Sequence, residues 1–280
     1  MRTLAEVLRL SASYLEERGS PTARLDAELL IGHALGLERI ELYTSFERPL
    51  HEPELAACRA LLERRGRREP VAYILGRWGF CGLDLQVDER VLVPRPETEV
   101  LVERCVALLR ERPGAHVLDV GTGSGAIALA VKAALPDVLV AATDVSADAL
   151  AVAAANADAL GLEVELVQGD LLGGLPGRRF DLIASNPPYV TEAEIETLAP
   201  EVARFEPRGA LVAGPEGTEV LARLAAAAPA ALAPGGRLVV ECGAGQAAAV
   251  GRLMQAAGAE ETGAERDLAG IERVVCGRWP

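Results

Sequence analysis

The chain has 280 residues, of which 50% are hydrophobic and 25% are charged, and its formal net charge is −13 at pH 7. This length allows one large domain or two moderate ones with a substantial core, and the composition is that of an ordinary soluble globular protein. The negative charge disfavours a protein whose main partner is a nucleic acid, because neutralising phosphates requires clustered Lys and Arg.

The cysteines, histidines and apolar runs argue against three further kinds of protein: disulfide-rich, metal-binding and membrane-spanning. Five Cys and three His are dispersed along the chain without any C-x-x-C spacing, so we expect neither a disulfide framework nor a metal site. Acidic residues follow the N-terminus closely, and no window reaches the ~18 uncharged residues of a membrane span. We therefore expect a cytoplasmic protein without membrane association.

Apolar residues recur at helical spacing in three stripes, over residues 4–15, 25–34 and 55–62. Proline and glycine separate the stripes, which predicts a small helical bundle; we assign residues 1–75 to this domain. A basic run over residues 63–69 closes it. This run is typical of a solvated helix end, and a contact with an acidic partner or RNA is the alternative.

Residues 76–96 change in character. Trp78, Phe80, Leu83 and Leu85 alternate with smaller or polar residues, which predicts a β-hairpin that links the two domains.

Strands and helices alternate in residues 97–280. The predicted strands cover residues 117–120, 138–142, 164–167, 180–184 and 237–241, and the predicted helices cover residues 126–135, 147–160 and 219–233. This alternation predicts an α/β fold, Rossmann-like, with a mostly parallel sheet covered on both faces. Residues 272–276 are expected to add a final antiparallel edge strand.

A glycine-rich loop, Asp119 to Gly125, follows the first predicted strand and opens a helix, and Asp144 ends the next strand. Glycines let a ligand approach the main chain, and an acid about 20 residues further on suits ribose hydroxyls. The pattern predicts a nucleoside-containing ligand. It also satisfies the dinucleotide fingerprint, so a hydride-transfer enzyme stays open. Asp119 could contact the ligand or be a buried acid that caps the loop.

The segment Ser185-Asn186-Pro187-Pro188-Tyr189 follows the buried run of residues 180–184. Proline has no N–H and a fixed φ, so the loop is stiff and rich in acceptors. The Asn186 side-chain oxygen and the Pro187 carbonyl could accept both N–H groups of a planar amide or amine, with Tyr189 covering one face. A simple turn is the alternative interpretation.

Together these motifs resemble those of class I S-adenosylmethionine-dependent methyltransferases that act on amino nitrogens. The chain is most similar to the protein-(glutamine-N5) methyltransferases that modify peptide-chain release factors. Further segments also resemble signatures of that family, namely residues 69–76, 93–99, 206–211 and 241–243 with Gln246, as does the helical N-terminal domain. The similarity covers nearly the full length and implies a seven-stranded sheet.

The resemblance also implies the site residues. The cofactor, which becomes S-adenosylhomocysteine, would be bound by Asp119, Gly121, Thr122, Gly123, Ser124, Gly125, Asp144, Asp170, Leu171 and Asn186. The substrate amide would be bound by Asn186, Pro187, Pro188 and Tyr189, of which Asn186, Pro187 and Tyr189 would be catalytic. Leu171 stands where relatives often carry an aromatic residue near the adenine, so an aliphatic contact replaces stacking.

The implied function is methyl transfer to the side-chain amide of the glutamine in the GGQ motif of class 1 release factors, which modulates translation termination. The helical domain would recognise this partner, and a monomer is expected. The residues near the amide do not exclude a ribosomal-protein glutamine, and the exocyclic amine of adenine presents the same planar group. A noncatalytic adaptor and a dehydrogenase are further alternatives, which binding of S-adenosylmethionine or NAD would distinguish.

Overall fold

The structure is a computed structural model that describes residues 2–280. The described chain divides into two compact units. The first comprises Met1–Arg77 and Ala199–Phe205, and the second comprises Trp78–Leu198 and Glu206–Pro280. The helical domain expected over residues 1–75 did not include Ala199–Phe205, which belongs to the first unit.

The first unit is helical. Its helices are α1 (Leu4–Glu17), α2 (Ala23–Leu35), α3 (Arg39–Thr44), α4 (Glu52–Gly66), α5 (Val71–Leu75) and α9 (Pro200–Phe205). A capping box starts α1, in which Thr3 and Glu6 satisfy each other's backbone N–H groups, and Gly36 in the left-handed region ends α2. These local signals explain where α1 begins and where α2 ends, close to the ends of the predicted apolar stripes.

A buried charge network stabilises this unit. The side chain of Arg65 in α4 is only 4% exposed, and its Nε donates to Asp26 Oδ2 at 2.7 Å. Its Nη2 lies 3.2 Å from Glu201 Oε1 in α9, and Arg68 also binds Glu201. The basic run is therefore not uniformly a solvated helix end, because two of its arginines hold α9.

The second unit contains the hairpin and the large sheet. Strands β1 (Arg77–Phe80) and β2 (Leu83–Gln86) form the predicted hairpin. The remaining elements are α6 (Pro96–Leu109), β3 (His116–Val120), α7 (Ala126–Ala134), β4 (Leu139–Asp144), α8 (Ala147–Leu160), β5 (Glu165–Gln168), β6 (Phe180–Ser185), β7 (Val190–Thr191), the 3-10 helix η1 (Ile195–Thr197), α10 (Arg208–Leu211), β8 (Val212–Gly214), α11 (Glu219–Ala231), β9 (Leu232–Glu241), α12 (Ala247–Ala256), β10 (Glu261–Arg266) and β11 (Glu272–Arg278).

The large sheet has seven strands in the order β10-β11-β9-β6-β3-β4-β5. Strands β9, β6, β3, β4 and β5 pair in parallel, and β10 and β11 pair antiparallel. This confirms the predicted α/β fold with a mostly parallel sheet. The prediction that residues 272–276 form the edge was wrong, since β11 lies between β9 and β10. Strand β10 was missed because most of its residues are polar and exposed.

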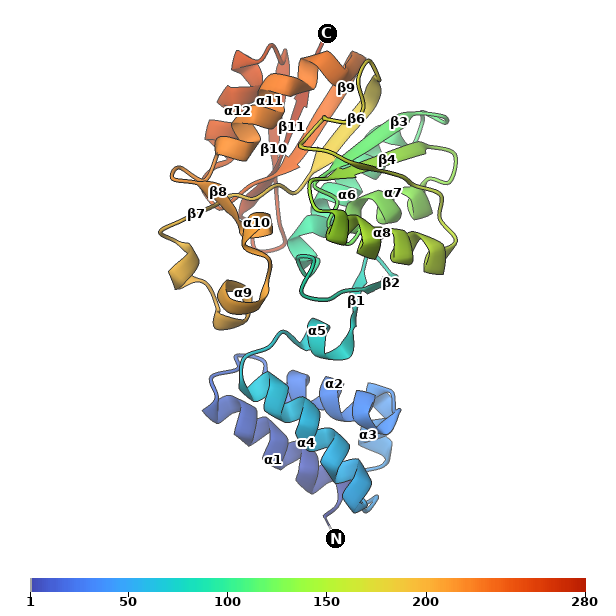
Figure 1. Cartoon of the computed structure of the whole chain (residues 1–280), viewed down its shortest axis with the longest axis vertical. Coiled ribbons are helices and arrows are strands. Elements are labelled where there is room, and N and C mark those ends of the chain that lie inside the picture. The colour runs from blue at the N-terminus through green and yellow to red at the C-terminus, as the bar shows by residue number, and fades with distance from the viewer. Residues whose placement is uncertain (1) are drawn as a thin grey trace. The chain divides into compact units, whose positions relative to one another are not determined.

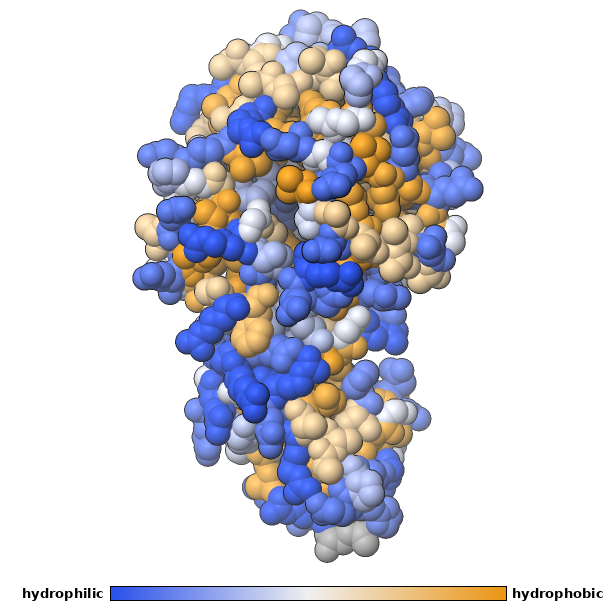
Figure 2. All heavy atoms as spheres, viewed as in Figure 1, coloured by the Kyte–Doolittle hydropathy of each residue, from blue (hydrophilic) through white to orange (hydrophobic). Residues whose placement is uncertain are grey.

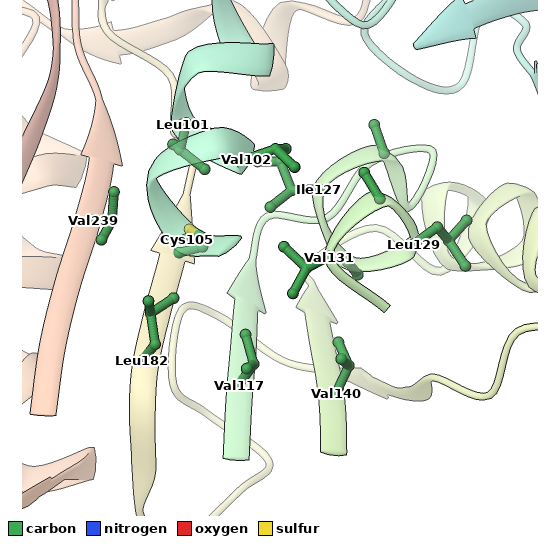
Figure 3. Packing of buried hydrophobic residues seen from close by; sticks show 14 of the residues in the cluster. Leu101, Val102, Cys105, Val117, Ile127, Leu129, Val131, Val140, Leu182 and Val239 are labelled. Atoms are coloured by element: carbon green, nitrogen blue, oxygen red, sulfur yellow. The ribbon is translucent and has the colours of Figure 1, made fainter. Parts of the chain in front are cut away.

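Alternate residues of the central strands face two separate cores. Val117 of β3 belongs to the core beneath α6, α7 and α8, and the next residue, Leu118, belongs to the core beneath α11 and α12 (Figure 1). Figure 3 shows the first core, where Val117, Val140 and Leu182 from neighbouring strands lie under Val131 and Cys105 from the helices. Both faces of the central strands are buried because these strands are largely apolar on both sides.

Hydrophilic residues are spread over the visible face of both units, with hydrophobic residues between them (Figure 2). Within residues 2–280, no helix is long and apolar enough to cross a membrane.

Candidate active site

A cavity of about 360 Å³ lies in the second unit, where β3, β4, β5 and β6 end. This is the edge at which open α/β sheets bind ligands. The predicted site residues that line it are Gly121, Thr122, Gly123, Ser124, Asp144, Asp170, Leu171, Asn186, Pro187 and Pro188. Segments that are more than 60 residues apart in the chain thus meet at one cavity, whose size is that of a typical small-molecule site.

The glycine loop forms one wall. Gly121 and Gly123 have φ values of 72° and 56°, which disfavour residues with a side chain, and a Cβ at either position would meet nothing within 4 Å. The main chain is therefore open toward the cavity. The residues present fit a nucleoside cofactor, because a bulky ligand can approach this backbone closely.

Asp119 is fully buried and does not line the cavity. Its Oδ2 accepts hydrogen bonds from Thr122 Oγ1 at 2.6 Å and from the Ala128 backbone N–H at 3.1 Å. Burial raises its pKa from 3.8 to about 7. Of the two roles considered for Asp119, the geometry supports the buried acid that holds the loop.

Asp144 ends β4 and lines the cavity. Its Oδ2 accepts from the Gly123 N–H and its Oδ1 from the Ser146 N–H, both at 2.9 Å. Each carboxylate oxygen keeps a further lone pair, so the group can also accept from two vicinal hydroxyls. The loop thereby fixes the direction in which this carboxylate points.

Leu171 adopts a φ of 52°, which is uncommon for a residue with a side chain, and it lines the cavity. Its carbonyl accepts from Thr143 Oγ1 at 2.9 Å. The neighbouring Asp170 also lines the cavity and pairs with Arg223. This wall is apolar at Leu171 and charged at Asp170 and Arg223. A heteroaromatic ring has an apolar face and polar edges, which such a wall could contact.

The proline-rich loop forms the opposite part of the lining. Asn186 Nδ2 donates to Thr98 Oγ1 at 3.0 Å. Tyr189 does not line the cavity; its hydroxyl donates to Glu241 at 3.3 Å, and burial raises its pKa. The role of Tyr189 as a cover for a flat group stays a prediction.

Gly125 is also outside the lining. Its φ is 83° and a Cβ there would lie 2.9 Å from Leu129 Cδ1. This glycine lets α7 start against its own first turn rather than touching a ligand.

Sequence reasoning assigned no role to four residues of this region. Thr98 and Arg95 line the cavity, Arg95 donates to the buried carboxylate of Glu206 at 2.6 Å, and Thr98 donates to Glu241. These four residues, Arg95, Thr98, Glu206 and Glu241, lie in segments that resemble the family signatures. That resemblance was the only sequence signal that could have pointed to them. Their roles depend on contacts between distant segments, which no spacing rule predicts.

Known proteins resemble both parts of the chain. A family model described as the PrmC N-terminal domain matches residues 6–76, and one described as the methyltransferase small domain matches residues 97–204. The chain is 47% identical over 276 residues to a release factor glutamine methyltransferase of Geobacter sulfurreducens, with 99% of this chain and 96% of that protein covered. It is 44% identical over 282 residues to one of Rhodopirellula baltica, with 98% and 95% covered.

A solved methyltransferase from Pyrococcus furiosus matches 70% of this chain and 89% of its own, with a TM-score of 0.52 and 20% identity. This likeness concerns the fold alone. The near-complete sequence matches go further. The chain therefore belongs to the release factor glutamine methyltransferase family of S-adenosylmethionine-dependent enzymes.

Proposed function

We propose that this enzyme transfers a methyl group from S-adenosylmethionine to the side-chain amide nitrogen of the glutamine in the GGQ motif of class 1 peptide-chain release factors. The observation that carries the proposal is that Asn186 and Pro187 line the same cavity as the open glycine loop and Asp144. Two acceptors for a planar amide, the Asn186 side chain and the Pro187 carbonyl, thus lie beside the residues that would hold a nucleoside. The names of the relatives at 44–47% identity support the same substrate.

The residues of the cavity suggest how each ligand part is held. Gly121 and Gly123 would leave room for the methionine part against the main chain, Asp144 would accept from the ribose hydroxyls, and Leu171 would contact the adenine; all four residues line the cavity. The cofactor supplies an electrophilic methyl group on a sulfonium. Bound in this way, the cofactor would have Asn186 and Pro187 in the same cavity to receive the substrate amide beside its methyl group.

The substrate nitrogen is a poor nucleophile because its lone pair is delocalised into the carbonyl. Acceptance of both N–H groups by Asn186 Oδ1 and the Pro187 carbonyl would aim this lone pair and stabilise positive charge as it develops on nitrogen. Orientation of reactants can lower a barrier by ~7–11 kcal/mol, whereas one neutral hydrogen bond contributes ~1 kcal/mol to stability. Positioning by the stiff proline loop is thus the larger effect. As the new N–C bond forms, the C–S bond of the sulfonium would break and S-adenosylhomocysteine would be released; the extra proton on the nitrogen would then pass to water.

The partner in this proposal is a protein. The chain has 41 acidic and 28 basic residues, which disfavours a nucleic-acid substrate. We assign recognition of the release factor to the helical domain and place the reaction in the cytoplasm, where termination occurs, with the enzyme acting as a monomer.

The test incubates the enzyme with labelled S-adenosylmethionine and a class 1 release factor and maps the label by mass spectrometry. We expect label on the GGQ glutamine, and its near-complete loss in Asn186→Ala while cofactor affinity changes by less than about tenfold. A ribosomal protein serves as the competing substrate. Label there and none on the release factor would refute the assigned substrate, and full activity of Asn186→Ala would refute the clamp.

A further inference from the structure

Three elements converge behind the proline-rich loop. Thr98 lies in the first turn of α6, Glu241 ends β9, and Asn186 follows β6. Thr98 is 3% exposed and Glu241 is 1% exposed. Thr98 Oγ1 lies 2.6 Å from Glu241 Oε2 and 3.0 Å from Asn186 Nδ2, so a single hydroxyl connects the buried acid to the amide.

The donors and acceptors in this chain have only one consistent arrangement when Glu241 is a carboxylate. A carboxylate only accepts, so the Thr98 hydroxyl must donate its single proton to Glu241. Its oxygen can then only accept from Asn186, and the group that Asn186 turns toward it must be the NH2. The side-chain oxygen of Asn186 is left for the cavity.

The other carboxylate oxygen of Glu241 holds the end of the same loop. Tyr189 donates to Glu241 Oε1 at 3.3 Å, and the Tyr189 backbone carbonyl accepts from Gln246 Nε2 at 3.0 Å. Burial raises the pKa of Glu241, whereas the hydrogen bonds from Thr98 and Tyr189 and the charge of Arg273 favour the ionised form. Two hydroxyl donors on two different oxygens suit a carboxylate.

We propose that Thr98 and Glu241 are positioning residues of the methyl transfer: Glu241 sets the direction of the Thr98 hydroxyl, and Thr98 thereby turns the amide of Asn186 so that its oxygen accepts from the substrate nitrogen. The inference rests on the proposed function, since the accepted group is the glutamine NH2. An Asn186 amide turned the other way would present its own NH2 to that NH2, and no hydrogen bond would form.

The kinetic test compares Thr98→Val, which removes the hydroxyl and keeps the branched shape, with Thr98→Ser, which keeps the hydroxyl. We expect Thr98→Val to lose about 100-fold in kcat on the release factor and Thr98→Ser to remain within about threefold of wild type. Cofactor affinity by calorimetry should be unchanged in both, which also shows that the cavity is folded. If Thr98→Val does not fold, Thr98→Ala removes the same hydroxyl. Retention of full kcat without the hydroxyl would overturn the proposal.

A spectroscopic test reads the amide directly. The chain contains two asparagines, Asn156 and Asn186, so protein labelled with ¹⁵N-asparagine should give two side-chain NH2 pairs, and Asn186→Ala assigns them. Asn156 donates to the Gln86 and Ser124 carbonyls and serves as an internal reference. We expect Thr98→Val to shift the Asn186 pair and leave the Asn156 pair in place. An Asn186 pair that does not move would contradict the hydrogen bond on which the proposal depends.

The two readouts separate the proposals. If the wild-type enzyme does not label the release factor, the proposed function fails while the NMR comparison still tests the orientation of Asn186. If wild type and Thr98→Val label it equally fast, the function stands and the positioning role is wrong.

Discussion

Two carboxylates on the neighbouring parallel strands β3 and β4 illustrate how environment decides the role of a residue. Asp119 in β3 is fully buried and binds Thr122 and the start of α7, whereas Asp144 at the end of β4 is partly exposed and lines the cavity. The pKa of Asp119 is raised to about 7 by burial. One acid therefore supports the loop and the other is available to a ligand.

Asp119 should give the protein a pH-dependent stability. Its pKa rises from 3.8 to about 7 on folding, so the folded state binds the proton more tightly and the free energy of unfolding falls as pH rises through this range. Asp119→Asn removes this contribution. Relative to wild type, we expect the variant to gain stability progressively as pH rises from about 4 to about 7, and the gain to stay constant above about pH 7, measured by urea unfolding at each pH.

Because other titrating groups are shared, the difference between the two proteins isolates Asp119. Asp119 Oδ1 has no hydrogen-bond partner among residues 2–280, so replacing this oxygen with an NH2 group removes no hydrogen bond. A stability difference that does not depend on pH would show that Asp119 does not titrate in this range.

Asp144→Ala should weaken S-adenosylmethionine binding by about tenfold or more, because a charged acceptor for hydroxyl donors contributes roughly 1.5–3 kcal/mol. Calorimetry measures the affinity. Asp148→Ala is the matched control, since Asp148 is exposed on α8 and does not line the cavity. Equal affinities in Asp144→Ala and wild type would remove Asp144 from the cofactor site.

At the scale of elements, the site depends on how helices start at the end of the sheet. Gly125 and Gly161 both adopt positive φ next to helices, at 83° and 63°. A Cβ on Gly125 would lie 2.9 Å from Leu129 Cδ1, whereas one on Gly161 would meet nothing within 4 Å. At Gly125, both the packing against Leu129 and the backbone conformation therefore favour glycine.

Gly125→Ala is therefore expected to cost more stability than Gly161→Ala. The left-handed conformation costs an alanine roughly 1–2 kcal/mol at either position, and forced repacking adds about 1–3 kcal/mol at Gly125 alone. The free energy of unfolding in urea measures both variants. Equal losses would indicate that Leu129 moves aside without cost.

At the scale of the whole molecule, the chain forms two compact units, and the helical one includes residues 199–205 from the middle of the methyltransferase sequence. The buried pair of Arg65 with Asp26, extended to Glu201, holds this segment in the helical unit. The boundaries 1–75, 76–96 and 97–280 expected from the sequence stay a prediction.

Asp26→Ala should destabilise the helical unit by about 3–5 kcal/mol, because it removes the carboxylate that makes the shortest ion pair with the buried Arg65. Hydrogen exchange in the full chain measures this, with lost protection expected in α1, α2 and α4 and little change in the sheet. Arg67→Ala is the control, since Arg67 is an exposed neighbour in the same basic run. Unchanged protection in Asp26→Ala would show that the network contributes little.

The five parallel strands of the large sheet, the helices α7, α8 and α11, the glycine loop and the proline-rich loop could be predicted from the sequence, because each depends on local periodicity or on residues with special backbone preferences. Strand β10 could not, since it lacks the apolar alternation that marks a strand. Its place is determined by pairing with β11.

The sequence alone determined that a nucleoside-type loop and an acceptor-rich corner each follow a strand of one mostly parallel sheet. Only the tertiary structure decided which residues line the cavity: Asp119 and Tyr189 do not, whereas Thr98 of α6 does. The reason is physical. Local motifs set backbone conformation over a few residues, whereas burial and hydrogen-bond partners depend on contacts between segments far apart in the chain, such as Thr98 with Glu241.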